Sequence, residues 1–222
     1  MNFFKKSKWT KTIVVLLLAM TVFSCKETKN ETPVKSAEAV KEVSAEAVKY
    51  LVDIEKSTIA WKGAKKVGDS HHGTLQISEG YLALKDGKLS SGNFVIDMTS
   101  IKNIDIEDAG YNKKLTDHLN SADFFDVAKY PTAVFEITDV NYEVGMDMVK
   151  GNLTIKGITK SIEIPATTAL SGSDGASFKS LTFTIDRTVW NVKYNSGKFF
   201  DDLKDKLIND EIEFTINLIA KK

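Results

Sequence analysis

The chain has 222 residues, of which 42% are hydrophobic and 27% charged, and its formal net charge is zero. This composition provides enough apolar sequence for one domain with a sizeable core. A net charge of zero gives no indication of the concentrated basic face that nucleic-acid-binding proteins require, so we expect no nucleic-acid partner.

The first 24 residues differ from the rest of the chain. They contain four lysines and no acidic residue, followed by an uninterrupted apolar run over residues 13–20. A basic start, a short apolar run and small residues before a cleavage point predict a secretory signal peptide. An N-terminal membrane helix is the alternative, but the apolar run is shorter than the roughly 20 residues that span a bilayer.

Cys25, the only cysteine in the chain, lies directly after this leader. The stretch resembles the lipobox of bacterial lipoproteins, in which this cysteine is lipidated and becomes the first residue of the mature chain. The resemblance implies an exported lipoprotein of the cell envelope. Lys26, directly after the cysteine, resembles outer-membrane lipoproteins, so we expect an anchor in the outer membrane, on the periplasmic side or at the cell surface. The exported domain would contain no disulfide bond.

Residues 25–48 are rich in Lys, Glu, Ala, Ser and Thr and contain no aromatic residue. The hexapeptide SAEAVK occurs at 36–41 and again at 44–49. Such a segment cannot bury enough apolar surface to fold alone. We expect a flexible tether over 25–48 and a single folded domain over 49–222.

Most of the folded domain alternates between apolar and polar residues with a period of two, which predicts antiparallel strands with one buried face. Apolar residues alternate in this way at 59–61, 94–98, 149–155, 181–185 and 212–218. Asp86-Gly87 predicts a hairpin between two strands. About eight strands at this spacing indicate a closed barrel or a sandwich.

Two segments interrupt the strand pattern. Residues 108–125 have helical spacing, with Tyr111, Leu115, His118 and Leu119 on one face. Within this stretch, Ser121 is the expected N-cap of a short turn that directs Phe124 and Phe125 inward at the barrel mouth. Residues 199–208 are expected to form a second short helix or lid. The predicted fold is therefore an all-β, antiparallel barrel of about eight strands with a short helical insertion.

Few residues suggest chemistry. His71 and His72 are adjacent, so on a strand they face opposite sides and are poorly placed to share a metal ion. The third histidine, His118, is distant in sequence, and the chain has no HExxH or GxSxG motif. We expect no metal site and no catalytic residues.

Arg187 is the only arginine among 30 basic residues. This suggests a position that lysine would fill poorly, because the planar guanidinium pairs with carboxylates and stacks on aromatic rings. The alternatives are a structural ion pair at one end of the barrel and a polar contact to a ligand head group.

Several stretches together resemble the YceI-like family of exported lipid-binding proteins. They are WKGAKKVGDSHHGTLQI, GNFVIDMTSI, SADFFDVAKYPTAVFEI, VKGNLTIKGITK and FTIDRTVWNVKYNSGKFFDDLKDKLINDEIEFTINLIAKK. The resemblance implies an elongated lipocalin-like barrel around an apolar tunnel that binds a polyisoprenoid chain, such as a quinone tail or a polyprenyl lipid. No cofactor is expected other than the bound lipid.

The resemblance and the strand alternation together predict the side chains that contact the lipid. They are Trp61, Phe94, Ile96, Phe124, Phe135, Ile137, Phe183, Arg187, Trp190 and Phe214. Two other functions remain open: an enzyme that acts on a lipid-like substrate inside the barrel, and a structural, stress-protective envelope protein whose tunnel is filled by its own side chains.

Overall fold

The structure is a computed structural model that describes residues 32–222. The predicted leader and Cys25 lie outside the described residues. The elements, in chain order, are β1 (Lys35–Ser36), β2 (Val48–Val52), β3 (Thr58–Ala64), β4 (Ser70–Lys85), β5 (Lys88–Asn103), α1 (Ala109–Asn120), β6 (Thr132–Glu143), β7 (Met146–Ile155), β8 (Ile158–Ser171), β9 (Gly175–Ser180), β10 (Phe183–Asp186), the 3₁₀ turns η1 (Arg187–Trp190) and η2 (Lys204–Lys206), and β11 (Glu211–Lys221).

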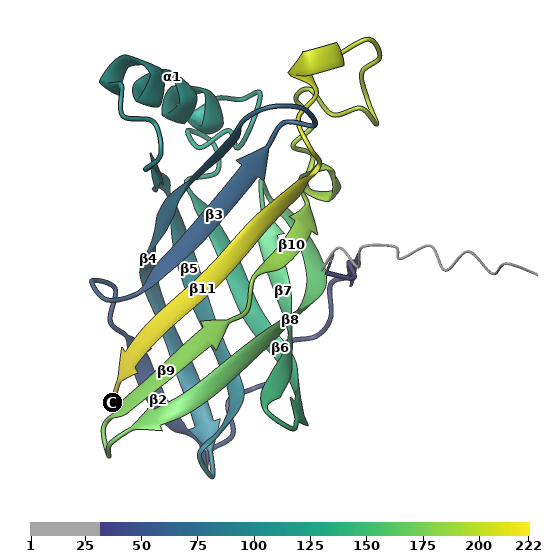
Figure 1. Ribbon diagram of the computed structural model, residues 1–222. Helices are drawn as coiled ribbons and strands as arrows, with labels where there is room; N and C mark the ends of the chain where they lie inside the picture. The colour runs from purple at the N-terminus through teal and green to yellow at the C-terminus, as the bar shows by residue number, and fades with distance from the viewer. Residues whose placement is uncertain (1–31) are drawn as a thin grey trace, which may run out of the picture.

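The strands form a closed antiparallel ring with eight positions (Figure 1). β3 pairs with β4, each later strand pairs with the next as far as β9, and β11 closes the ring by pairing with both β9 and β3. At two of these positions, two short strands follow one another in place of one long strand. β2 and β3 both lie between β4 and β11, and β9 and β10 both pair with β11. The predicted all-β antiparallel barrel with a helical insertion is confirmed.

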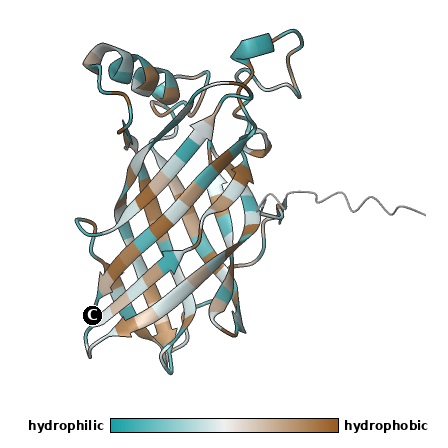
Figure 2. Cartoon of the chain, in the orientation of Figure 1, coloured by the Kyte–Doolittle hydropathy of each residue, from teal (hydrophilic) through white to brown (hydrophobic). Residues whose placement is uncertain are grey.

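The alternation in the sequence directs one set of side chains into the barrel. Along β6, Ala133, Phe135 and Ile137 are buried, while Val134 and Glu136 are half-buried on the other face. Figure 2 shows the same alternation of apolar and polar residues along the tilted strands. The predicted hairpin at Asp86-Gly87 joins β4 to β5, and both residues have the positive φ (51° and 76°) that a tight turn of this kind requires.

The helix covers the open end of the barrel, here called the mouth (Figure 1). Asp108 caps its N-terminus by accepting a hydrogen bond from the backbone of Tyr111 at 2.9 Å, and Leu119 is buried on its inner face. The prediction that Ser121 is an N-cap is wrong: Ser121 is the C-cap, and its hydroxyl donates to the carbonyl of His118 at 2.8 Å. Phe124 and Phe125 follow in a turn and are buried, as predicted.

The second predicted helix is mostly absent. Over residues 199–208 the structure contains only η2, a single 3₁₀ turn. Asp202 and Lys204 have φ values of 56° and 50°, and this left-handed backbone interrupts a right-handed helix. Across residues 32–222, no helix is both long enough and apolar enough to cross a membrane.

The segment expected to be a tether contacts the barrel over its described part. β1 pairs with β8 through Lys35 and Ser36. The backbone N–H of Glu38 donates to the Asn152 side chain at 2.9 Å, and the Asn152 amide donates back to the Glu38 carbonyl at 2.7 Å. The expectation of a free spacer therefore does not describe these residues, because pairing with β8 and hydrogen bonds to the Asn152 side chain, which composition does not reveal, attach them to the wall.

Candidate ligand-binding site

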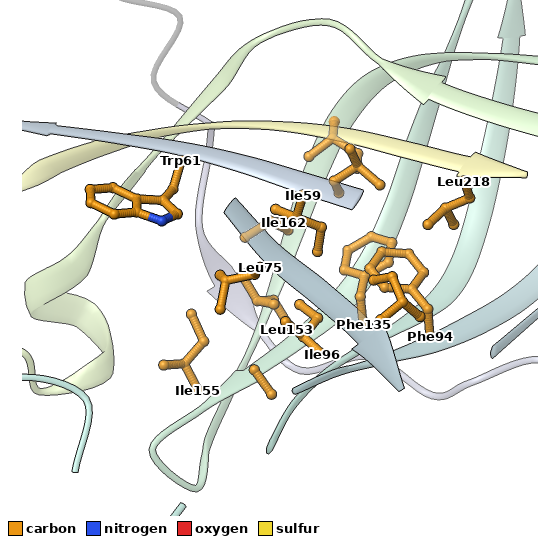
Figure 3. Packing of buried hydrophobic residues seen from close by; sticks show 14 of the residues in the cluster. Ile59, Trp61, Leu75, Phe94, Ile96, Phe135, Leu153, Ile155, Ile162 and Leu218 are labelled. Carbon is orange, nitrogen blue, oxygen red and sulfur yellow. The ribbon is translucent and has the colours of Figure 1, made fainter. Parts of the chain in front are cut away.

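A cavity occupies the half of the barrel interior that lies nearest the mouth. Its lining is apolar except for Arg187 and Asn209. The lining comprises Ile59, Trp61, Gly63, Leu75, Phe94, Ile96, Met98, Ile101, Leu119, Phe124, Phe125, Ala133, Phe135, Leu153, Ile155, Ile162, Phe183, Ile185, Arg187, Ile208, Asn209, Ile212, Phe214 and Ile216. Figure 3 shows several of these side chains converging from different strands.

The other half of the interior is filled by side chains. Buried residues such as Leu82, Leu89, Ile137, Phe178 and Leu218 belong to the same apolar core but do not line the cavity. Phe94 and Phe135 lie where the hollow half meets the filled half, with ring centroids 5.3 Å apart (Figure 3). The tunnel implied by the resemblance is therefore a pocket that lies nearest the mouth and is closed at its far end.

A wider hollow beneath α1, here called the vestibule, adjoins the cavity. The cavity volume is about 90 Å³ and that of the vestibule about 1050 Å³. Five residues line both spaces and form the neck between them: Trp61, Gly63, Leu119, Phe124 and Ile208. The vestibule is more polar, since its lining includes lysine, aspartate and histidine side chains.

Trp61 reaches the neck because a glycine faces it. Trp61 on β3 pairs with Gly73 on β4, and a Cβ atom at position 73 would lie 2.9 Å from the indole ring. The indole nitrogen of Trp61 is buried and has no hydrogen-bond partner within residues 32–222. Trp190 differs, since its indole nitrogen donates to the Leu153 carbonyl at 3.0 Å.

Arg187 lies at the edge of the cavity, and each of its three guanidinium nitrogens donates a hydrogen bond. It donates to the carbonyls of Asn209 (3.0 Å), Val192 (2.7 Å) and Ile208 (3.2 Å), and lies 3.5 Å from an Asp210 carboxylate oxygen. Burial lowers the pKa of this arginine, and the carboxylates of Asp210 and Asp186 oppose that shift. These contacts fasten the segment after β10 to the start of β11, so they favour the structural alternative for Arg187.

The paired histidines meet a carboxylate at the rim. A ring nitrogen of His71 lies 2.8 Å from Asp105, and the backbone N–H of His72 donates to the same carboxylate at 2.8 Å. Burial alone would raise the pKa of Asp105, but the hydrogen bonds from His72, His71 and Asn103 outweigh it and lower the pKa to about 2. His71 and His118 both line the vestibule. Over residues 32–222, no group of three or more potential ligands could hold a metal ion.

Eight of the ten residues predicted to contact lipid line the cavity: Trp61, Phe94, Ile96, Phe124, Phe135, Phe183, Arg187 and Phe214. Ile137 and Trp190 are buried but lie outside its lining. Ile137 is in the filled half of the barrel, and a register irregularity follows it in β6. Trp190 belongs to η1 and is directed at the wall by its hydrogen bond to β7.

Several lining residues were not predicted from the sequence, for two different reasons. Ile59, Ile162 and Ile216 follow the same alternation as the predicted residues, so the pattern itself could have identified them. Ile208 and Asn209 lie between η2 and β11 in irregular backbone, where no periodicity indicates direction.

Comparison with solved structures identifies similar barrels. BcnA of Burkholderia cenocepacia aligns with a TM-score of 0.56 at 25% sequence identity, over 76% of this chain and 99% of that one. A polyisoprenoid binding domain from Saccharophagus degradans aligns with a TM-score of 0.56 at 13% identity, over 78% and 97% of the two chains. At 13% identity, the second similarity concerns the fold alone.

Sequence comparison identifies shorter matches to curated proteins. A UPF0312 protein of Pseudomonas aeruginosa is 44% identical over 57 residues, and Protein YceI of Salmonella arizonae is 42% identical over 57 residues. Each match spans 26% of this chain and only 30% of the relative. The family model of the YceI-like domain matches residues 50–220, which is nearly all of the barrel. The chain therefore belongs to the YceI-like domain family.

Proposed function

We propose that the protein binds a long apolar lipid of the isoprenoid type in the barrel cavity, and holds or carries that lipid in the cell envelope. The observation that carries this proposal is an apolar cavity in the half of the barrel nearest the mouth, adjoining a more polar vestibule. An amphiphile with an apolar tail and a polar end matches both spaces. The structural neighbour from Saccharophagus degradans is a polyisoprenoid binding domain, which supports the same class of ligand.

The physical driving force is the transfer of apolar surface out of water. Each buried methylene group contributes about 0.8 kcal/mol, before the costs of ordering the chain. The cavity, about 90 Å³, is much smaller than a long isoprenoid chain. A long chain therefore requires the side chains around the cavity to move apart as it enters, and Met98, which is flexible, lines the path.

A pair of alanines tests this site. Ala133 is 2% exposed and lines the cavity, whereas Ala60 lies on the outer face of β3. Ala133→Leu places three more carbon atoms where the ligand would lie, so we expect binding of solanesol, a polyprenol, to weaken about tenfold or more. The matched variant Ala60→Leu should leave it unchanged. Bound solanesol is extracted and quantified across a titration, with circular dichroism confirming that both variants are folded. Equal weakening in both variants, or in neither, would place the ligand elsewhere.

The enzyme and structural alternatives give different results in the same assay. An enzyme would return a chemically altered lipid after incubation, whereas a binding protein returns the lipid it was given. A protein that takes up no solanesol would favour the structural alternative.

We propose further that Cys25 carries a lipid anchor, on the basis of its position after the apolar leader. Cys25→Ser removes the only thiol that could be acylated. We expect the variant to remain unprocessed or unlipidated and to leave the outer-membrane fraction. Mass spectrometry of the N-terminus and membrane fractionation are the measurements, and normal processing with unchanged partitioning of the variant would refute the anchor.

A further inference from the structure

One seam in the barrel wall is closed by a segment that is not a barrel strand. β9 pairs with β8 as far as Ser180 and Ala166, and the backbone of Leu181 then donates to Pro165 at 2.9 Å. Beyond that point β8 and β10 are not paired with each other, and this break in the strand pairing is the seam. β10 pairs only with β11, and the facing edge of β8 pairs only with β1, among the residues that the structure describes.

Residues 32–36, here called the strap, fill the space between these two edges (Figure 1). On one side, Lys35 and Ser36 pair with β8. On the other side, the backbone N–H of Thr32 donates to Thr184 of β10 at 2.9 Å. Thr32 is 5% exposed, and Val34 packs against the core. The strap is therefore part of the wall, although it is attached through far fewer hydrogen bonds than the long strands around it.

The cavity lies directly behind the seam. Ile162 on β8 and both Phe183 and Ile185 on β10 line the cavity, and these strands are the two edges that the strap joins. Displacing the strap would open the wall beside the apolar cavity. The route through the mouth, in contrast, passes the neck beneath α1, where Trp61, Leu119 and Phe124 are buried.

We propose that the strap is a lateral gate, and that the lipid enters and leaves through the seam between β8 and β10 rather than through the mouth. This inference rests on the proposed binding of a lipid in the cavity. Segments that open to admit ligands come from the weakly held parts of a fold, which fits a two-residue strand. The strap also begins seven residues after Cys25, so a lipid anchor there would hold the seam within about 25 Å of the membrane surface.

A reversible crosslink tests the gate in the full mature chain. Ser36 and Lys160 are directly paired across β1 and β8, so Ser36→Cys with Lys160→Cys should form a disulfide that locks the strap. The control joins Asn141→Cys with Met148→Cys, a pair within the continuous β6–β7 ladder. The measurement is the rate at which solanesol-loaded protein releases its lipid to acceptor vesicles, under oxidising and reducing conditions.

We expect release from the locked strap to be at least about tenfold slower when oxidised and to recover on reduction. The β6–β7 crosslink should leave the rate unchanged in both states. Equal rates for the oxidised and reduced strap variants would overturn the gate and assign exchange to the mouth. A protein that never takes up solanesol instead contradicts the proposed function, so the two failures are distinguishable.

A second variant covers the case in which the disulfide does not form. Val34→Asp places a charge where an apolar side chain packs on the core, which should loosen the strap and speed release. Val40→Asp, at an exposed residue four positions beyond the strap, is the control. An unchanged release rate in a folded Val34→Asp protein would overturn the proposal.

Discussion

At the scale of single residues, the arginine shows how one side chain can hold an irregular segment in place. Arg187 is 1% exposed and donates hydrogen bonds to three backbone carbonyls. Two of these carbonyls, those of Ile208 and Asn209, belong to the segment that leads into β11. Ile208 and Asn209 also line the cavity. The arginine therefore shapes the cavity through the backbone it binds.

Arg187→Lys should lower the free energy of unfolding by about 2–4 kcal/mol. The guanidinium donates hydrogen bonds to three carbonyls at once, and a single ammonium group cannot reach all three. Lys62→Ala, on the outer face of β3, should change it by less than about 0.5 kcal/mol. Urea denaturation measures both variants. An Arg187→Lys protein as stable as the wild type would mean that these hydrogen bonds contribute little.

At the scale of elements, alternation predicted the strands because each has one face toward the barrel interior. The helix was predicted over 108–125, and the structure places it at Ala109–Asn120, where Ser121 ends it. The contacts of the N-terminal segment could not be predicted in this way. They depend on backbone hydrogen bonds and on Asn152, an amide in a distant strand, and neither leaves a pattern in local sequence. The positive φ values at Asp202 and Lys204 likewise have no glycine to indicate them.

Asn152→Ala tests how firmly the N-terminal segment is held. Asn152 is 4% exposed and exchanges two hydrogen bonds with the backbone of Glu38. Losing them should destabilise the protein by about 1–2 kcal/mol and raise hydrogen exchange over residues 32–41. Asn141→Ala, exposed on β6, is the matched control. Unchanged exchange in the Asn152 variant would show that the segment is held by other contacts.

At the scale of the whole molecule, the barrel is divided between a filled half and a hollow half. The filled half provides a core that stabilises the fold without a ligand, and the hollow half offers apolar surface to a lipid. The sequence could predict which side chains point inward, but not where a cavity remains between them. The position of the cavity depends on how the tilted strands bring residues of different sizes to the same level of the barrel. Phe94 and Phe135, for example, meet at the level between the two halves.

The claim that the cavity binds an isoprenoid lipid is tested most directly by identifying what the protein carries. Full-length protein is purified in mild detergent from the cells that produce it, its bound lipids are extracted, and mass spectrometry compares them with those of the Ala133→Leu variant. The account predicts an isoprenoid lipid bound to the wild type and a strongly reduced amount in the variant. Equal amounts of the same lipids in both proteins, or a wild-type protein that carries no lipid and takes up none, would contradict it.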